Sequence, residues 1–137
     1  PIGPADAISL PPSDQAPWIA PRIALALTVA GAVVVLVGSL MPPGDPASQL
    51  FAGHGPVRHT TAYAALAVPV AVLWPAALPR AIVGLFLFGV GVELVQGQVG
   101  RDAEVSDALF NGLGLLIGGT VGWLGRAMAR WLRARRH

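Results

Sequence analysis

Four apolar runs dominate the sequence, and each is long enough to cross a membrane as a single helix. They cover residues 23–41, 60–78, 81–99 and 108–125. The hydrocarbon core of a bilayer is about 30 Å thick, a distance that takes about 20 helical residues. Because backbone groups in lipid must form their hydrogen bonds internally, runs of this kind are predicted to be α-helices.

The composition agrees with a membrane environment. Hydrophobic residues make up 54% of the 137 residues and charged residues only 12%, whereas soluble domains carry about 25% charged residues. No cysteine is present, which excludes disulfides, thiolate metal sites and cysteine nucleophiles. We therefore predict an all-α, polytopic membrane protein with a single bundle of four transmembrane helices.

The distribution of arginine predicts the orientation of this bundle. All nine basic residues are arginines, and a cytoplasmic C-terminus leaves only Arg58 and Arg101 outside. Such an excess of inner arginine is typical of cytoplasmic loops, and tryptophan is enriched at membrane boundaries. The four tryptophans fall near the same inner boundary: Trp18, Trp74, Trp123 and Trp131. We expect a multi-pass protein of the bacterial inner (cytoplasmic) membrane with both termini in the cytoplasm.

Three segments follow from this topology. We predict a Pro-rich cytoplasmic N-terminal tail (1-21), a four-helix transmembrane domain (22-125) and an Arg-rich cytoplasmic C-terminal tail (126-137). The last segment can rest against anionic headgroups as a topology anchor. The loop after the first span has room for a short surface helix starting at Asp45 and Pro46. Pro69 is predicted to kink the second span.

The polar residues of the spans concentrate at the predicted outer end. His59 begins the second span, Glu93 and Gln96 end the third, and Asp107 and Asn111 begin the fourth. Glu93 and Gln96 are three residues apart and share a helix face. Ionisable residues within spans usually face the bundle interior and have partners. We predict one pocket lined by Arg58, His59, Tyr63, Glu93, Gln96, Arg101, Asp107 and Asn111.

Pairing within this pocket is expected to offset the cost of placing charge inside a span. An Asp near the centre of a span costs about 2.5 to 3.5 kcal/mol, and less toward the ends. The expected partner of Glu93 is Arg101 or His59, while Asp107 could hold either outer arginine. Gly89 lies one turn before Glu93 and is predicted to leave room for the backbone of a neighbouring helix.

One face of the fourth span carries polar residues at its outer end and glycines, which have no side chain, along the rest. Its members follow at helical spacing: Asp107, Asn111, Gly114, Gly118 and Gly122. Two consecutive GxxxG steps allow another helix to approach closely. The three glycines are therefore predicted to be helix-packing residues.

The order and spacing of these residues resemble the VanZ-like membrane proteins over about residues 58–122. The first shared motif is Glu93-x-x-Gln96, then Arg101, then Asp107-x-x-x-Asn111-Gly112-x-Gly114-x-x-x-Gly118. The second is His59-x-x-x-Tyr63-x-x-Leu66. The family often carries an Asp-Lys pair just before the histidine, where this chain has Gly55 and Pro56.

The resemblance implies a membrane fold with an outer polar site and a role at the cell envelope. Founding members of the family look like accessory factors for resistance to the glycopeptide teicoplanin, with no known catalytic step. We therefore expect a non-catalytic envelope factor that binds a lipid or glycopeptide-related headgroup. The arginines would grip a phosphate in bidentate fashion. Neither a cofactor nor a metal is expected, and the partners are membrane lipids.

Three alternatives remain open at this stage. The polar residues could serve structure alone, with Ser106 or Asp107 as the N-cap of the fourth helix. The chain could be an accessory structural subunit of a larger membrane complex, docking other membrane subunits through its N-terminal tail and helix faces. His59 with a carboxylate could act as an acid–base pair, or join His54 and the acids in a metal site, although no HExxH or GxSxG motif is present. Nucleic-acid binding is disfavoured, since no groove-reading element accompanies the basic residues.

Overall fold

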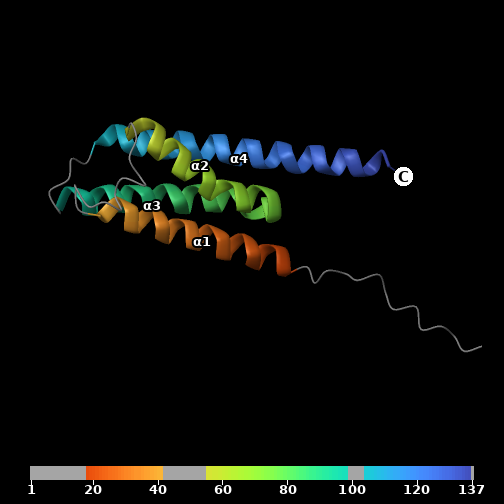
Figure 1. Ribbon diagram of the computed structural model, residues 1–137, viewed down its shortest axis with the longest axis horizontal. Coiled ribbons are helices and arrows are strands. Elements are labelled where there is room, and N and C mark those ends of the chain that lie inside the picture. Colours follow the sequence, from red (N-terminus) through yellow and green to blue (C-terminus); the bar gives the residue numbers. More distant parts are fainter. Residues whose placement is uncertain (1–17, 42–54, 99–103, 137) are drawn as a thin grey trace, which may run out of the picture.

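The computed structural model describes residues 18–41, 55–98 and 104–136, and nearly all of these residues are in helices. The helices are α1 (Ile19–Leu40), α2 (Gly55–Leu73), the short 3-10 helix η2 (Pro75–Ala77), α3 (Leu78–Gln98) and α4 (Val105–Ala134). Figure 1 shows the four long helices side by side along one axis. No strand occurs in the described ranges, so the all-α prediction is confirmed.

Three of the helical segments are long and apolar enough to cross a membrane. They are Ile19–Leu40, Pro75–Gln98 and Ser106–Ala134. The α2 helix does not meet this criterion. Its position in the bundle explains its more polar sequence, because α2 packs on α4, α1 and α3 and buries six of its residues. A helix enclosed by protein needs fewer lipid-facing side chains than one on the outside of a bundle.

Two boundaries differ from the sequence predictions. The second helix covers Gly55–Leu73 instead of 60–78, and Pro69 lies within it. It ends before Pro75, and the residue before a proline is disfavoured in the α conformation. The α4 helix runs without a break to Ala134. The Arg-rich segment after residue 125 is therefore largely the end of α4, since Ala, Arg, Leu and Met are strong helix formers.

The predicted N-terminal tail up to residue 17 and the surface helix at Asp45 and Pro46 lie outside the described residues. The same is true of Arg101 and His54.

The centre of the bundle is the contact between α2 and α4. A Cβ atom at Gly114 would collide with the backbone carbonyl of Thr60, and one at Gly118 would collide with that of Ala64. One turn further, a Cβ at Gly122 would lie 2.7 Å from that of Ala71. Only glycine allows the two backbones to come this close, which is the geometry that small residues permit between membrane helices.

The two ends of the bundle differ in charge. Figure 1 places the start of α1 and the end of α4 at one end, and the start of α2 and of α4 nearer the other. At the first end, the guanidinium groups of Arg22 and Arg135 lie 4.6 and 3.6 Å from the rings of Trp18 and Trp131. Arg126 donates a hydrogen bond to the carbonyl of Val72, one of the last carbonyls of α2, which have no partner within the helix.

Candidate functional site

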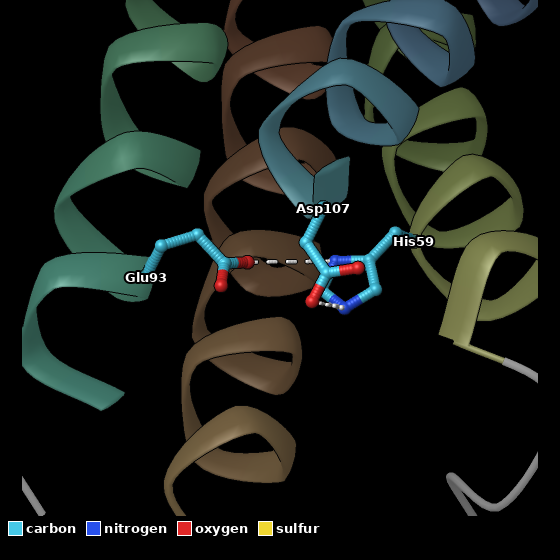
Figure 2. A group of neighbouring side chains, drawn as sticks. All are labelled: His59, Glu93 and Asp107. Carbon is cyan, nitrogen blue, oxygen red and sulfur yellow. Dashed lines mark ion pairs between the residues drawn. The ribbon is translucent and has the colours of Figure 1, made fainter. Parts of the chain in front are cut away.

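A buried polar cluster lies at the opposite end of the bundle, where three helices bring one ionisable residue each. His59 comes from the start of α2, Glu93 from the end of α3 and Asp107 from the first turn of α4. Figure 2 shows both carboxyl groups directed at the imidazole ring. His59 Nδ1 lies 3.6 Å from Glu93 Oε1, and Nε2 lies 3.5 Å from Asp107 Oδ2. The histidine thus bridges two carboxyl groups from different helices.

Asn111 orients the imidazole. Its Oδ1 lies 2.9 Å from His59 Nδ1, within hydrogen-bond distance, and the residue is only 1% exposed. An amide oxygen can only accept, so Nδ1 carries the hydrogen and donates it. In the neutral ring, Nε2 then has its lone pair directed at Asp107. The tautomer is therefore set by a side chain one turn beyond Asp107 on the same helix face.

Glu93 is buried, and no group donates a hydrogen bond to its carboxyl oxygens among the described residues. The residue is 8% exposed, and neither Oε1 nor Oε2 has a hydrogen-bond partner among the described residues. The Nδ2 atom of Asn111 is likewise buried and has no such partner in this part of the chain. A buried polar group without a partner is costly. These atoms are therefore the ones that a proton, water, ion or ligand would satisfy.

Gly89 provides space beside the cluster in a way that differs from the prediction. A Cβ atom there would lie 2.9 Å from both Asn111 Nδ2 and the hydroxyl of Tyr63. The glycine therefore makes room for two polar side chains and not for the backbone of a neighbouring helix. The glycine predicted space for a neighbouring group at this position, but the sequence does not show which atoms occupy that space.

A partly open cavity of about 310 Å³ adjoins the cluster between α1, α2 and α3. Its wall is mostly apolar, with Val34, Val35 and Leu66 among its lining residues. His59 and Glu93 also line it, as does Arg58, which is exposed. The cavity therefore joins a hydrocarbon-like wall to a buried carboxyl group and a cation.

Gln96 connects α3 to α1 at the edge of this cavity. Its Nε2 atom donates a hydrogen bond of 2.7 Å to the carbonyl of Ser39, near the end of α1. Otherwise α1 meets the bundle mainly through small or short residues, with only Ala24 and Thr28 buried along its length. The link fixes the position of α1, which forms one side of the cavity.

Replacing Gln96 by leucine should loosen this wall with a modest loss of stability. One interhelical hydrogen bond in a membrane protein is worth about 0.6 kcal/mol on average and at most about 1.7 kcal/mol. We expect a decrease of about 1 kcal/mol in the free energy of unfolding, measured by thermal unfolding in detergent. The matched change Gln98→Leu, at the exposed end of α3, should have little effect. Equal losses in the two variants would contradict the assigned role.

The structure distributes the predicted lining residues in three ways. It brings together His59, Glu93, Asp107 and Asn111, with Tyr63 beside them and only 2% exposed. Arg58 and Gln96 lie around the cavity. Arg101 falls outside the described residues, so its predicted pairing with Glu93 stays a prediction.

Two features differ from the sequence analysis or were not found by it. The N-cap of α4 is Glu104, not Ser106 or Asp107, and the Ser106 hydroxyl donates to Glu104 Oε2 at 2.9 Å. The contribution of α1 to the cavity was not predicted. A signal for it exists, since Gly31 and Gly38 are seven residues apart on one helix face and both line the cavity.

The chain matches no known protein family, no curated protein and no solved structure.

Proposed function

We propose that this chain is a four-span membrane protein whose outward-facing site binds the headgroup of a membrane lipid. The observation that carries the proposal is the cavity between α1, α2 and α3, in which an apolar wall meets the buried Glu93 and the exposed Arg58. In this arrangement α2 is the fourth span, enclosed by the other three helices. The VanZ-like sequence pattern supports the same type of envelope factor.

The charge distribution supports an orientation with both termini in the cytoplasm. The described arginines other than Arg58 belong to the start of α1, the start of α3 and the end of α4. These segments lie at the end of the bundle away from the cluster (Figure 1). Since arginine accumulates on the cytoplasmic side, the polar cluster faces outward in the bacterial inner membrane.

The dimensions and chemistry of the cavity suit an amphipathic ligand. Its volume of about 310 Å³ lies at the lower end of the about 300–1,000 Å³ found for small-molecule sites. An acyl chain would contact Val34, Val35 and Leu66, while Arg58 would bind the phosphate. One unpartnered oxygen of Glu93 would accept a hydrogen bond from an ammonium group. A zwitterionic phospholipid such as phosphatidylethanolamine combines all three groups.

Arg58→Ala should weaken phospholipid binding by about 10- to 100-fold, because a hydrogen bond to a charged group is worth about 1.5–3 kcal/mol. The measurement is native mass spectrometry of the purified chain with added phosphatidylethanolamine or phosphatidylglycerol. Arg80→Ala, exposed at the start of α3 near the other end of the bundle, is the matched control and should bind lipid as the unmodified chain does.

The results of this experiment distinguish lipid binding at this site from the role of an accessory subunit. Equal affinity for the two lipids would contradict the ammonium contact at Glu93. An unchanged affinity in Arg58→Ala would contradict the site, and so would the absence of any bound lipid. If polypeptides co-purify in fixed ratio and lipid does not, the chain is instead an accessory subunit of a membrane complex.

A further inference from the structure

We infer that His59, Glu93 and Asp107 together bind one divalent transition-metal ion. This proposal stands on the geometry of the cluster and does not depend on lipid binding. Each residue offers one ligand atom, and the three atoms lie within 4.8 Å of one another. The residues are buried or half-buried and come from three different helices, so the bound ion would cross-link α2, α3 and α4.

The donor set suits particular metals. One imidazole nitrogen and two carboxylate oxygens form a mixed site, in which imidazole favours zinc and similar ions while carboxylates also suit manganese. Three protein ligands leave one position of a tetrahedral zinc ion open. We therefore expect Zn²⁺ to bind most tightly, with Mn²⁺ as a weaker alternative.

The distance between His59 Nε2 and Asp107 Oδ2 is longer than a hydrogen bond and close to the distance between two ligands across a metal ion. Ordinary N–H···O bonds measure about 2.7–3.2 Å, whereas Nε2 lies 3.5 Å from the facing oxygen of Asp107. Ligand bonds of about 2.0–2.2 Å to zinc place two ligands of a tetrahedral ion about 3.4 Å apart. The pair formed by His59 Nε2 and Asp107 Oδ2, at 3.5 Å, already has this spacing.

The hydrogen bond to Asn111 leaves the correct imidazole nitrogen available. A metal-bound histidine almost always donates its other ring N–H to a carboxylate, a carbonyl or water. Here Nδ1 lies 2.9 Å from the amide oxygen of Asn111. In the neutral ring the lone pair of Nε2 faces an oxygen of Asp107 that also bears lone pairs, and a metal cation between the two atoms would be attracted to both.

Glu93 supplies an independent observation that points to a bound cation. Its side chain is 10% exposed, and both of its oxygens lack a hydrogen-bond partner among the described residues. Figure 2 shows its carboxyl group directed into the cluster toward the imidazole of His59. Its Oε1 faces Nδ1, and rotation of the side chain toward Nε2 would bring one oxygen into the coordination shell. A divalent ion would balance the charge of both carboxylates.

The test is metal titration of the full, tag-free chain in detergent after treatment with a chelator and without added lipid. Isothermal titration with ZnCl₂ should show one ion per chain, and the ion should raise the melting temperature. Glu93→Gln and Asp107→Asn should each weaken binding by about 100-fold or more, beyond the 10- to 100-fold typical of residues that only orient a ligand. Glu104→Gln, at the exposed N-cap of α4, is the matched control and should bind zinc normally.

A second measurement on the unmodified chain keeps the proposal testable if these variants do not fold. Bound Co²⁺ should give the visible absorption bands of a four-coordinate site with nitrogen and oxygen ligands. No zinc binding, unaltered binding in Glu93→Gln, or no Co²⁺ bands would each overturn the proposal. Because no lipid is present, these results leave the lipid-binding experiment unaffected, and the two proposals can fail separately.

Discussion

A single methyl group at position 118 is expected to lower the free energy of unfolding by about 3 kcal/mol, the upper end of the usual cost of overpacking. A Cβ atom at Gly118 would overlap the backbone carbonyl of Ala64 in α2. Backbone cannot rotate away as the end of a flexible side chain can, so α2 and α4 would have to separate. This contact is the most extensive in the bundle, and separation would also move His59 away from Asp107.

The control for Gly118→Ala is the same substitution at Gly125 in the same helix. A Cβ atom there would meet nothing within 4 Å, and alanine is favoured over glycine in a helix by about 1 kcal/mol. Gly125→Ala should therefore leave stability unchanged or raise it slightly. Thermal unfolding in detergent, followed by circular dichroism, measures both variants. Similar melting temperatures for the two would show that the glycine stripe does not set the α2–α4 distance.

The hydrophobic pattern predicted the number of long helices but not all of their limits. Apolar runs are governed by burial in lipid or protein, which explains why α1 and α3 were found within a few residues. The start of α2 was missed because Gly55 and Pro56 read as a loop and are followed by polar residues. Of these polar residues, His59 faces protein in the bundle, and single-sequence hydropathy cannot distinguish that environment from water.

The gathering of polar side chains could be anticipated because each lies near the end of its helix. Consecutive spans run in opposite directions, so the start of α2, the end of α3 and the start of α4 must share one end. The alternating direction of the spans brings His59, Glu93 and Asp107 to the same end of the bundle. It does not determine rotation about each helix axis, which depends on packing of small residues such as Gly89 against Tyr63 and Asn111.

The contacts that sequence reasoning could not supply involve backbone atoms. Gln96 was expected to line the pocket and does line the cavity, but the bond from its amide to the carbonyl of Ser39 on α1 was not expected. Every residue has a carbonyl, so no residue type marks such an acceptor. For the same reason, the glycine stripe indicated a close approach without identifying Thr60 and Ala64 as the neighbours.

His59→Leu should lower the free energy of unfolding by about 3–5 kcal/mol, the range found when one partner of a buried ion pair is removed. The histidine lies between the carboxyl groups of Glu93 and Asp107, and in its protonated form it is the positive charge between them, which leucine would remove. It would also remove the N–H group from which Asn111 Oδ1 accepts a hydrogen bond. If charge is involved, this loss of stability should exceed that of an apolar change at a buried position, such as Leu115→Ala. If the imidazole contributes packing alone, it should not.

A second substitution separates charge from packing at this position. In the double variant His59→Leu/Glu93→Gln, one of the two uncompensated carboxylates is gone and the other no longer has a like charge beside it, so we expect at least half of the lost stability to return. Glu93→Gln alone should leave stability unchanged or raise it, since a neutral amide loses less on burial than a charge does. Residues in direct contact show interaction energies of about 0.5–3 kcal/mol in such cycles. If His59→Leu costs the same whether residue 93 is Glu or Gln, the imidazole contributes packing alone, and the cluster has no electrostatic coupling on which a cation or a headgroup could act.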